Sequence, residues 1–342
     1  MKIEQYKKLG KTFVIAEIGQ AHDGSYGILQ SMIEAIAKTG VDAVKFQIHV
    51  ADAESSTLEP FRVKFSDVDR TRYDYWKRME LSIEQWQKIK DMCDKLNLEF
   101  LATPFSNEAV NILEKLKVNK YKIGSGDFSN FLMLEKISLT GKEIILSTGL
   151  GTLSDLDESI NFLKKFNVNY SLLQCTTKYP TKPEEIGLNW IEKYCDRYKC
   201  PVGLSDHSGE IFPSIGAVSL GASIIEAHMT FDKDMFGPDS NASLTVDQFK
   251  EMVRGIRFIE KAKFSEDSNE VNKELNHLKD IFGRALAINK NLLKGHVITF
   301  EDLEGKKPSN AGILAKDYKK IINKKLTRDK NKWDFLKTND IE

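Results

Sequence analysis

Eight short β-rich runs recur along the first 230 residues, and this repetition constrains the fold more than any other feature of the chain. The runs cover residues 12–19, 42–48, 100–106, 120–126, 143–149, 170–176, 202–207 and 224–230. Amphipathic segments such as GILQSMIEAIAKTG and IEQWQKIKDMCDKLN separate most of them. Strand and helix alternating at this spacing are typical of a parallel sheet built from βαβ units. Eight such units within about 260 residues predict an α/β fold of the (β/α)8 TIM-barrel type.

An open, doubly wound sheet is the alternative α/β fold. Such a sheet that binds a dinucleotide carries a G-x-G-x-x-G turn after its first strand. The first run here continues as EIGQAHDG and lacks this motif. Nothing in the sequence therefore points to a dinucleotide cofactor.

Composition excludes several classes of partner. Lysine plus arginine number 50, as do aspartate plus glutamate, so the formal net charge is zero. Nucleic-acid binding needs a basic excess, and a membrane span needs about 20 apolar residues in a row, so neither partner is expected. The N-terminus lacks the apolar region of a signal peptide, and we expect a cytoplasmic protein whose four cysteines are reduced and structural.

The alternation of predicted strands and helices stops after residue 250, and this predicts a second domain. A final amphipathic helix (QFKEMVRGIRFIEKAKF) is followed by a polar stretch. We predict a catalytic barrel over 1–265, a linker over 266–282 and a small β-rich module over 283–342. Within this module, VITFEDL is echoed by FLKTNDI, which hints at internal repetition.

Polar residues gather at the carboxyl end of every predicted strand. A strand buried on both faces should be apolar throughout, so polar ends in register indicate the catalytic mouth of a barrel. Lys45 and Lys122 would point into this mouth among the hydroxyl groups of Thr103, Ser125, Ser147 and Ser205. Positive charge surrounded by donors predicts a clamp for phosphate or carboxylate, although a lysine in a barrel can also form a Schiff base.

Two histidines end neighbouring strands. His207 and His228 could hold one divalent ion with open coordination positions, as a Lewis acid requires, or could be satisfied structural residues. The carboxylates Glu17 and Asp239 are candidates for general acid–base groups.

The order and spacing of nine motifs resemble the N-acetylneuraminate (sialic acid) synthase family. These motifs are EIGQAHDGS, DAVKFQ, FLATPFS, YKIGSGD, ILSTG, QCTTKYP, GLSDHSG, EAHMTFD and GPDSNAS. Members of this family condense phosphoenolpyruvate with an N-acylated aldose to give a nine-carbon 2-keto acid and phosphate. The final module, with LLKGHVITFEDLEGKKPSNAGI, is similar to the antifreeze-protein-like (SAF) domain that ends these enzymes.

The resemblance implies roles for individual residues. Phosphoenolpyruvate would bind to Lys45, Thr103, Lys122, Ser125, Ser147, Thr177 and Ser205. A divalent metal, Mn²⁺ or Mg²⁺, would be held by His207 and His228, and Glu17 would handle protons. The acceptor sugar would contact Gln47, Tyr179, Asp239 and Lys307, the last reaching the barrel of a partner subunit in a domain-swapped homodimer.

The chain departs from the family pattern at positions that concern the acceptor. Lys307 stands where the family's KRPG-type motif has an arginine, and lysine lacks the planar fork of a guanidinium. The segment between the second and third strands offers only Asp67 as a loose match to an acceptor-contacting asparagine. The acceptor therefore stays open between N-acetylmannosamine and a diacetamido-trideoxyhexose that leads to a legionaminate- or pseudaminate-like product.

Three other functions stay open on the sequence. One is a related phosphoenolpyruvate-dependent synthase acting on a sugar phosphate. Another is a Schiff-base aldolase using Lys45 or Lys122. The third is a non-enzymatic carbohydrate-binding role, which only the SAF-like tail suggests.

Overall fold

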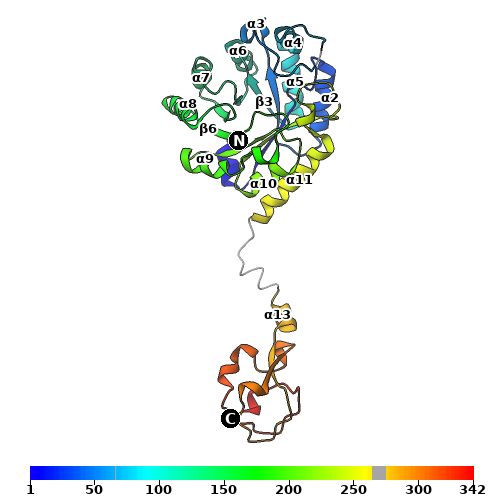
Figure 1. Ribbon diagram of the computed structural model, residues 1–342, viewed down its shortest axis with the longest axis vertical. Helices are drawn as coiled ribbons and strands as arrows, with labels where there is room; N and C mark the ends of the chain where they lie inside the picture. Colours follow the sequence, from blue (N-terminus) through cyan, green and yellow to red (C-terminus); the bar gives the residue numbers. More distant parts are fainter. Residues whose placement is uncertain (66, 264–274) are drawn as a thin grey trace. The chain divides into compact units, whose positions relative to one another are not determined.

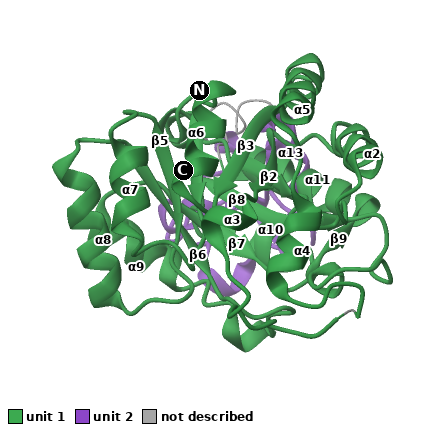
Figure 2. Ribbon diagram, turned by 90° about the horizontal axis from the view of Figure 1, so that it is seen from above, with its two compact units in different colours: residues 1–264 green, residues 265–342 purple. Residues whose placement is uncertain are grey.

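The computed structural model describes residues 1–65, 67–263 and 275–342. The chain forms two compact units, residues 1–264 and residues 265–342, each with its own apolar core (Figures 1 and 2). None of the helices in the described ranges combines the length and hydropathy needed to cross a membrane.

The first unit contains a closed barrel of eight parallel strands in sequence order. Each strand pairs with its neighbours along the chain, and β8 pairs with β1 to close the ring. The predicted TIM-barrel architecture is therefore confirmed for this unit. The strands are β1 (Phe13–Glu17), β2 (Ala43–Ile48), β3 (Glu99–Pro104), β4 (Lys120–Ile123), β5 (Glu143–Ser147), β6 (Tyr170–Cys175), β7 (Val202–Asp206) and β8 (Ile224–Thr230), with a short β9 (Leu244–Thr245) added beside β8.

Side chains on alternate strand positions point into the barrel and form layers. An apolar layer inside the barrel includes Ile15, Leu101, Ile145 and Leu173, all fully buried. Two residues further along each strand the inward positions become polar, as in Glu17 after Ile15 and Ser147 after Ile145. Because strand side chains alternate with a period of two, a polar floor follows directly from the strand sequences.

Amphipathic helices surround the strands (Figure 1). Their apolar faces pack on the outward residues of the strands, and several begin at a capping hydroxyl such as Ser82 or Thr152, which accepts a backbone N–H of the first turn. The helices are α1 (Ile3–Lys8), α2 (Tyr26–Ile36), α3 (Ala51–Glu54), α4 (Arg72–Met79), α5 (Ile83–Lys95), α6 (Asn107–Lys115), α7 (Phe131–Ser138), α8 (Leu153–Lys165), α9 (Trp190–Tyr198), α10 (Phe212–Ser219) and α11 (Val246–Lys263). Short 3₁₀ turns lie at Pro183–Glu185 and Ser240–Ala242.

A glycine sets the spacing of two strands that carry site residues. A Cβ atom added at Gly203 of β7 would collide with the carbonyl oxygen of Ile224 on β8. Only glycine lets the two backbones approach this closely. Ser205 and His207 follow Gly203, and His228 lies on the facing strand, so the close approach brings these side chains together.

The second unit is less rich in strands than the sequence predicts. Its sheet has two short antiparallel strands, β10 (Ala285–Ile288) and β11 (Leu303–Lys306), and further pairing occurs as isolated bridges. The 3₁₀ turns lie at Phe300–Asp302, Ser309–Ala311, Ala315–Lys320 and Thr338–Asp340.

The repetition expected within this unit has a structural counterpart. Asp302 and Asp340 end equivalent 3₁₀ turns, and each is a buried carboxylate in an ion pair, with Lys290 and Lys330 respectively. Buried carboxylates that also accept backbone N–H groups hold irregular backbone in place where ladder hydrogen bonds are few.

Part of the predicted linker is a helix. Within 266–282, the residues Asn276–Phe282 form α13, whose last turn packs on the second unit through a hydrogen bond from Ser309 Oγ to the Lys279 carbonyl (3.1 Å). Linker residues 266–274 lie outside the described residues.

Candidate active site

A cavity of about 440 Å³ opens at the carboxyl ends of the barrel strands. Every barrel residue predicted for the site lines it: Glu17, Lys45, Gln47, Thr103, Lys122, Ser125, Ser147, Thr177, Tyr179, Ser205, His207, His228 and Asp239. They come from eight strands and the loops that follow them, and the closed barrel brings them together. This is the end of a barrel where substrate and catalytic groups gather.

Four buried charges form the floor of the cavity. Lys45 Nζ lies 2.9 Å from Glu17 Oε2 and 3.8 Å from Glu226 Oε1, and Lys122 Nζ lies 3.3 Å from the same Glu226 oxygen. The four side chains are at most 5% exposed. Two ammonium groups and two carboxylates make the floor formally neutral without a ligand.

The two lysines experience different balances of burial and charge. Burial alone would lower the pKa of Lys45, but Glu17 and Glu226 outweigh it and raise the pKa. At Lys122 burial outweighs the attraction of Glu226, so the pKa is lowered. Despite its burial, Glu226 has a lowered pKa because both ammonium groups face it.

Hydroxyl groups surround the lysines. Lys122 Nζ donates to Ser147 Oγ (2.8 Å) and Lys45 Nζ to Thr103 Oγ1 (3.3 Å). Ser205 donates to Glu226, and Ser125 and Thr177 bond to each other across the cavity wall at 3.0 Å. Donors and positive charge concentrated at one end of a cavity suit a ligand with phosphate and carboxylate groups.

Two imidazoles and a phenol lie above this floor. The rings of His207 and His228 are 5.3 Å apart, and the Tyr179 ring stacks on His207 at 4.1 Å. His207 Nδ1 lies 2.9 Å from the Thr176 carbonyl, so Nδ1 carries the proton and the Nε2 lone pair accepts from the Tyr179 hydroxyl at 3.1 Å. Burial lowers the pKa of His207 to about 3, which keeps it neutral.

The histidine pair fits a metal ion that other ligands complete. Metal binding requires a neutral imidazole that can offer a lone pair. His207 is neutral, and a metal ion would take the place of the Tyr179 hydroxyl as the partner of its Nε2 lone pair. The ring nitrogens of His228 have no hydrogen-bond partner among the described residues. No group of three or more metal-binding side chains occurs in these residues, so any metal here would be held by two imidazoles.

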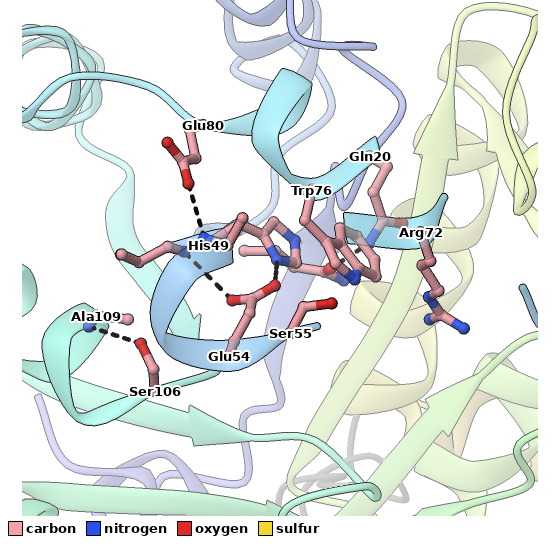
Figure 3. A network of polar contacts seen from close by, with 12 residues as sticks. Gln20, His49, Glu54, Ser55, Arg72, Trp76, Glu80, Ser106 and Ala109 are labelled. Carbon is pink, nitrogen blue, oxygen red and sulfur yellow. Dashed lines mark hydrogen bonds and ion pairs between the residues drawn. The ribbon is translucent and has the colours of Figure 1, made fainter. Parts of the chain in front are cut away.

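The outer wall of the cavity contains a third histidine, His49, which is also buried. His49 Nδ1 lies 2.7 Å from Glu54 Oε1, and the imidazole lies between the rings of Trp76 and Phe105 at 4.2 and 4.8 Å (Figure 3). Figure 3 also shows Glu80, which accepts the Ala51 backbone N–H at the start of α3. This network holds the residues after β2 against α4.

Arg62 lies at the same end of the cavity, in the segment between α3 and α4. Its Nη2 lies 2.6 Å from Asp239 Oδ1, and its guanidinium carbon lies 4.1 Å from the centre of the Tyr179 ring. Asp67, the loose sequence candidate from this segment, is exposed, pairs with Lys64 and is absent from the cavity wall.

Lys307 belongs to the second unit. It follows β11, and its ammonium lies 5.1 Å from the centre of the Phe282 ring in the same unit. Its predicted contact with the acceptor of a partner subunit stays a prediction.

Sequence reasoning assigned no role to Glu226, Arg62 or Glu54. The signal for Glu226 was present, because it lies two residues before His228 on one strand and must share its inward face. Arg62 and Glu54 lie in a segment without regular periodicity, so their inward orientation depends on tertiary packing.

Comparison with known proteins identifies the family. The model of the NeuB family matches residues 32–268. N,N'-diacetyllegionaminic acid synthase of Campylobacter jejuni is 34% identical over 96% of this chain and 99% of its own. Human N-acetylneuraminate-9-phosphate synthase is 30% identical over 92% of this chain and 88% of its own.

A solved structure agrees with this result. The N-acetylneuraminic acid (sialic acid) synthetase of Leptospira borgpetersenii, in complex with citrate, superimposes with a TM-score of 0.67 at 28% identity, covering 78% of this chain and 90% of the other. The match to the family model and the relatives that span almost the whole chain lead to one conclusion: the chain belongs to the NeuB family.

Proposed function

We propose that the protein is a phosphoenolpyruvate-dependent nonulosonic acid synthase. It condenses phosphoenolpyruvate with an N-acylated hexosamine-type aldose and releases phosphate. The observation that carries the proposal is the floor of the cavity, where Lys45 and Lys122 lie among hydroxyl groups below His207 and His228. Relatives named as legionaminic, pseudaminic and N-acetylneuraminate-9-phosphate synthases support the same reaction class.

The reaction forms one C–C bond and, from water, one C–O bond at C2, and it breaks the C–O bond between C2 and the phosphate group. C3 of phosphoenolpyruvate attacks the aldehyde carbon, and the aldehyde oxygen takes up a proton to become a hydroxyl. Water adds to the cationic C2 and loses a proton. The resulting tetrahedral carbon expels phosphate and becomes the ketone of the 2-keto acid.

The floor residues stabilise the anionic groups throughout. Lys45, Lys122 and the hydroxyls of Thr103, Ser147 and Ser205 bind the phosphate and carboxylate, and their donors are in position before the substrate arrives. Glu17 is the proposed proton-handling group. It is fully buried, accepts from Gln47 Nε2 at 2.8 Å, pairs with Lys45, and is the register partner of His228 on β8.

His207 and His228 are the proposed ligands of a divalent ion, Mn²⁺ or Mg²⁺. Such an ion would act as a Lewis acid on the aldehyde oxygen. The charge balance of the site supports a bound cation. The floor is formally neutral, but the substrate brings the negative charges of a phosphate and a carboxylate, which a divalent ion would help to neutralise. With its Nδ1 proton donated to the Thr176 carbonyl, His207 would offer the ion its Nε2 lone pair in place of the Tyr179 hydroxyl.

The charges of the outer wall favour an acceptor without a phosphate group. Two guanidinium groups, Arg62 and Arg72, line this wall, and both are already ion-paired. The carboxylates there are more numerous: Glu54, Glu59, Asp127 and Asp239. A phosphate needs surplus positive charge, so we favour an uncharged N-acylated aldose over a sugar phosphate.

The second unit is proposed to act as an SAF-like lid. In this proposal the protein is a homodimer in which Lys307 of one subunit reaches the acceptor in the barrel of the other. The small size of the unit and the position of Lys307 beside a tight turn at Pro308–Ala311 support this proposal.

A panel of aldoses tests the function. Enzyme, phosphoenolpyruvate and Mn²⁺ are combined with N-acetylmannosamine, its 6-phosphate or 2,4-diacetamido-2,4,6-trideoxymannose, and phosphate release and product mass are measured. The proposal expects phosphate and nonulosonic acid in equal amounts with an uncharged N-acylated aldose. Turnover with the phosphorylated sugar alone would overturn the acceptor assignment.

A Schiff-base aldolase is the second candidate because of one observation. Burial lowers the pKa of Lys122, as an imine-forming lysine requires. Its ammonium, however, is held between Glu226 and Ser147, which suits a charged clamp. Borohydride reduction in the presence of pyruvate, followed by peptide mass analysis, would reveal an imine on Lys122 if the aldolase assignment were correct.

A further inference from the structure

Arg62 connects two loops that form the outer wall of the cavity. It lies between α3 and α4, whereas its ion-pair partner Asp239 lies after β8. A second contact joins the same loops, since the rings of Phe65 and Phe236 are 5.4 Å apart. Two contacts therefore join these loops, one at Arg62 itself and one three residues after it.

The guanidinium is held in a defined orientation next to the proposed reaction centre. It lies 4.1 Å from the centre of the Tyr179 ring, and the Tyr179 hydroxyl bonds to His207 Nε2. One nitrogen, Nη2, donates to Asp239 at 2.6 Å. Stacking on an aromatic ring and a charged hydrogen bond together restrict a side chain that is otherwise long and flexible.

Most of the donors of Arg62 remain free for a ligand. A guanidinium carries five N–H groups, and the described residues accept only from Nη2. The side chain is 37% exposed and lines the cavity, so the remaining donors can reach a molecule bound there. Arg72 on the same wall differs, because it stacks on Trp76 and pairs with Glu59.

We propose that Arg62 is a binding residue for the acceptor aldose. Its free N–H groups donate to an oxygen atom of the sugar, and the pair with Asp239 and the stacking on Tyr179 hold the fork in place for this contact. Because phosphoenolpyruvate binds at the floor, Arg62 affects the sugar and leaves phosphoenolpyruvate binding unchanged. This inference rests on the proposed synthase function.

The test measures steady-state kinetics of Arg62→Gln and Arg62→Lys in the full-length protein. The probe is whichever of N-acetylmannosamine and 2,4-diacetamido-2,4,6-trideoxymannose the wild-type enzyme uses. A lost charged hydrogen bond corresponds to an increase of about 10- to 100-fold in the KM for the aldose, with the KM for phosphoenolpyruvate unchanged. The KM for the aldose in Arg62→Lys should lie between those of the wild type and Arg62→Gln. An ammonium can pair with Asp239 but lacks the additional directed donors of a guanidinium.

Arg70→Gln is the matched control. Arg70 lies in the same segment and is exposed, and it does not line the cavity, so its substitution removes the same charge without a ligand contact. Three results would overturn the proposal: an unchanged KM for the aldose in Arg62→Gln, full recovery by Arg62→Lys, or equal increases for both substrates. Failure of the proposed function is a separate result, since the wild-type protein would then release no phosphate with either aldose.

Discussion

At the scale of single residues, the two floor lysines are the clearest case of a charge held for a ligand. Replacing Lys122 by Met removes one ammonium group that hydroxyls and Glu226 have fixed in position. A charged contact contributes about 1.5–3 kcal/mol, so kcat/KM for phosphoenolpyruvate should fall about 10- to 100-fold.

Lys120→Met provides the matched control for this variant. Lys120 lies on the same strand, is equally buried and pairs with Glu99 at 2.6 Å, outside the cavity. Loss of Lys120 should lower the free energy of unfolding while leaving the KM for phosphoenolpyruvate unchanged. Equal kinetic losses in the two variants would show that Lys122 acts through the fold alone.

His22 supplies a prediction about stability and pH. Burial, together with the charges of His49 and Arg78, lowers the pKa of His22 to about 4. Between about pH 6.5 and pH 4 the unfolded chain binds a proton at this residue and the folded protein does not, so stability present above pH 6.5 is lost as the pH falls. The free energy of unfolding should be lower at pH 4 than at pH 7 by on the order of 3 kcal/mol from this residue.

His22→Asn should remove most of this pH dependence, because a neutral amide has no proton to bind. Urea unfolding at pH 7 and at pH 4.5 measures the free energies of wild type and variant. The difference in the free energy of unfolding between wild type and variant should shrink at the lower pH, or reverse in favour of the variant. Parallel losses of stability in both proteins would mean that His22 titrates normally.

At the scale of secondary-structure elements, the spacing of β7 and β8 depends on Gly203. A methyl group at this position would collide with the Ile224 carbonyl oxygen, which is rigid strand backbone. Gly203→Ala should therefore lower the free energy of unfolding by about 1–3 kcal/mol or more. Gly27→Ala in α2 is the control, since an added Cβ there meets nothing within 4 Å and should be neutral or slightly stabilising. Chemical denaturation measures both, and a stable Gly203→Ala protein would contradict the close approach of the strands.

The elements also show how far sequence reasoning reaches. Strand bounds and the inward face could be predicted, because alternation with a period of two fixes which side chains share a face, as for Lys45 and Gln47 of β2. Arg62 could not be predicted, because its position depends on Asp239 and Tyr179, which lie more than a hundred residues away in sequence. The β-rich expectation for residues 283–342 was too strong, because 3₁₀ turns held by buried Asp302 and Asp340 replace most of the ladder pairing.

At the scale of the whole molecule, the proposed exchange of the second unit between subunits makes a prediction about mixed dimers. Lys122→Met should impair only the barrel, and Lys307→Glu should impair only the second unit. If the unit acts on the partner's barrel, a mixed dimer has one barrel with an intact lid, and co-expression of the two variants should restore up to about a quarter of wild-type activity. Activity no higher than that of either variant alone would count against the exchange.

The central claim is that phosphoenolpyruvate condenses with an aldose through cleavage of its C–O bond. The most direct measurement uses phosphoenolpyruvate carrying ¹⁸O in the bridge between C2 and phosphorus, with product and phosphate analysed by mass spectrometry. Because the tetrahedral intermediate expels phosphate from C2, the label should leave entirely with phosphate, in a one-to-one ratio with a nonulosonic acid, and only when the aldose is present. Label retained in the keto acid, or phosphate released at the same rate without the aldose, would contradict the account.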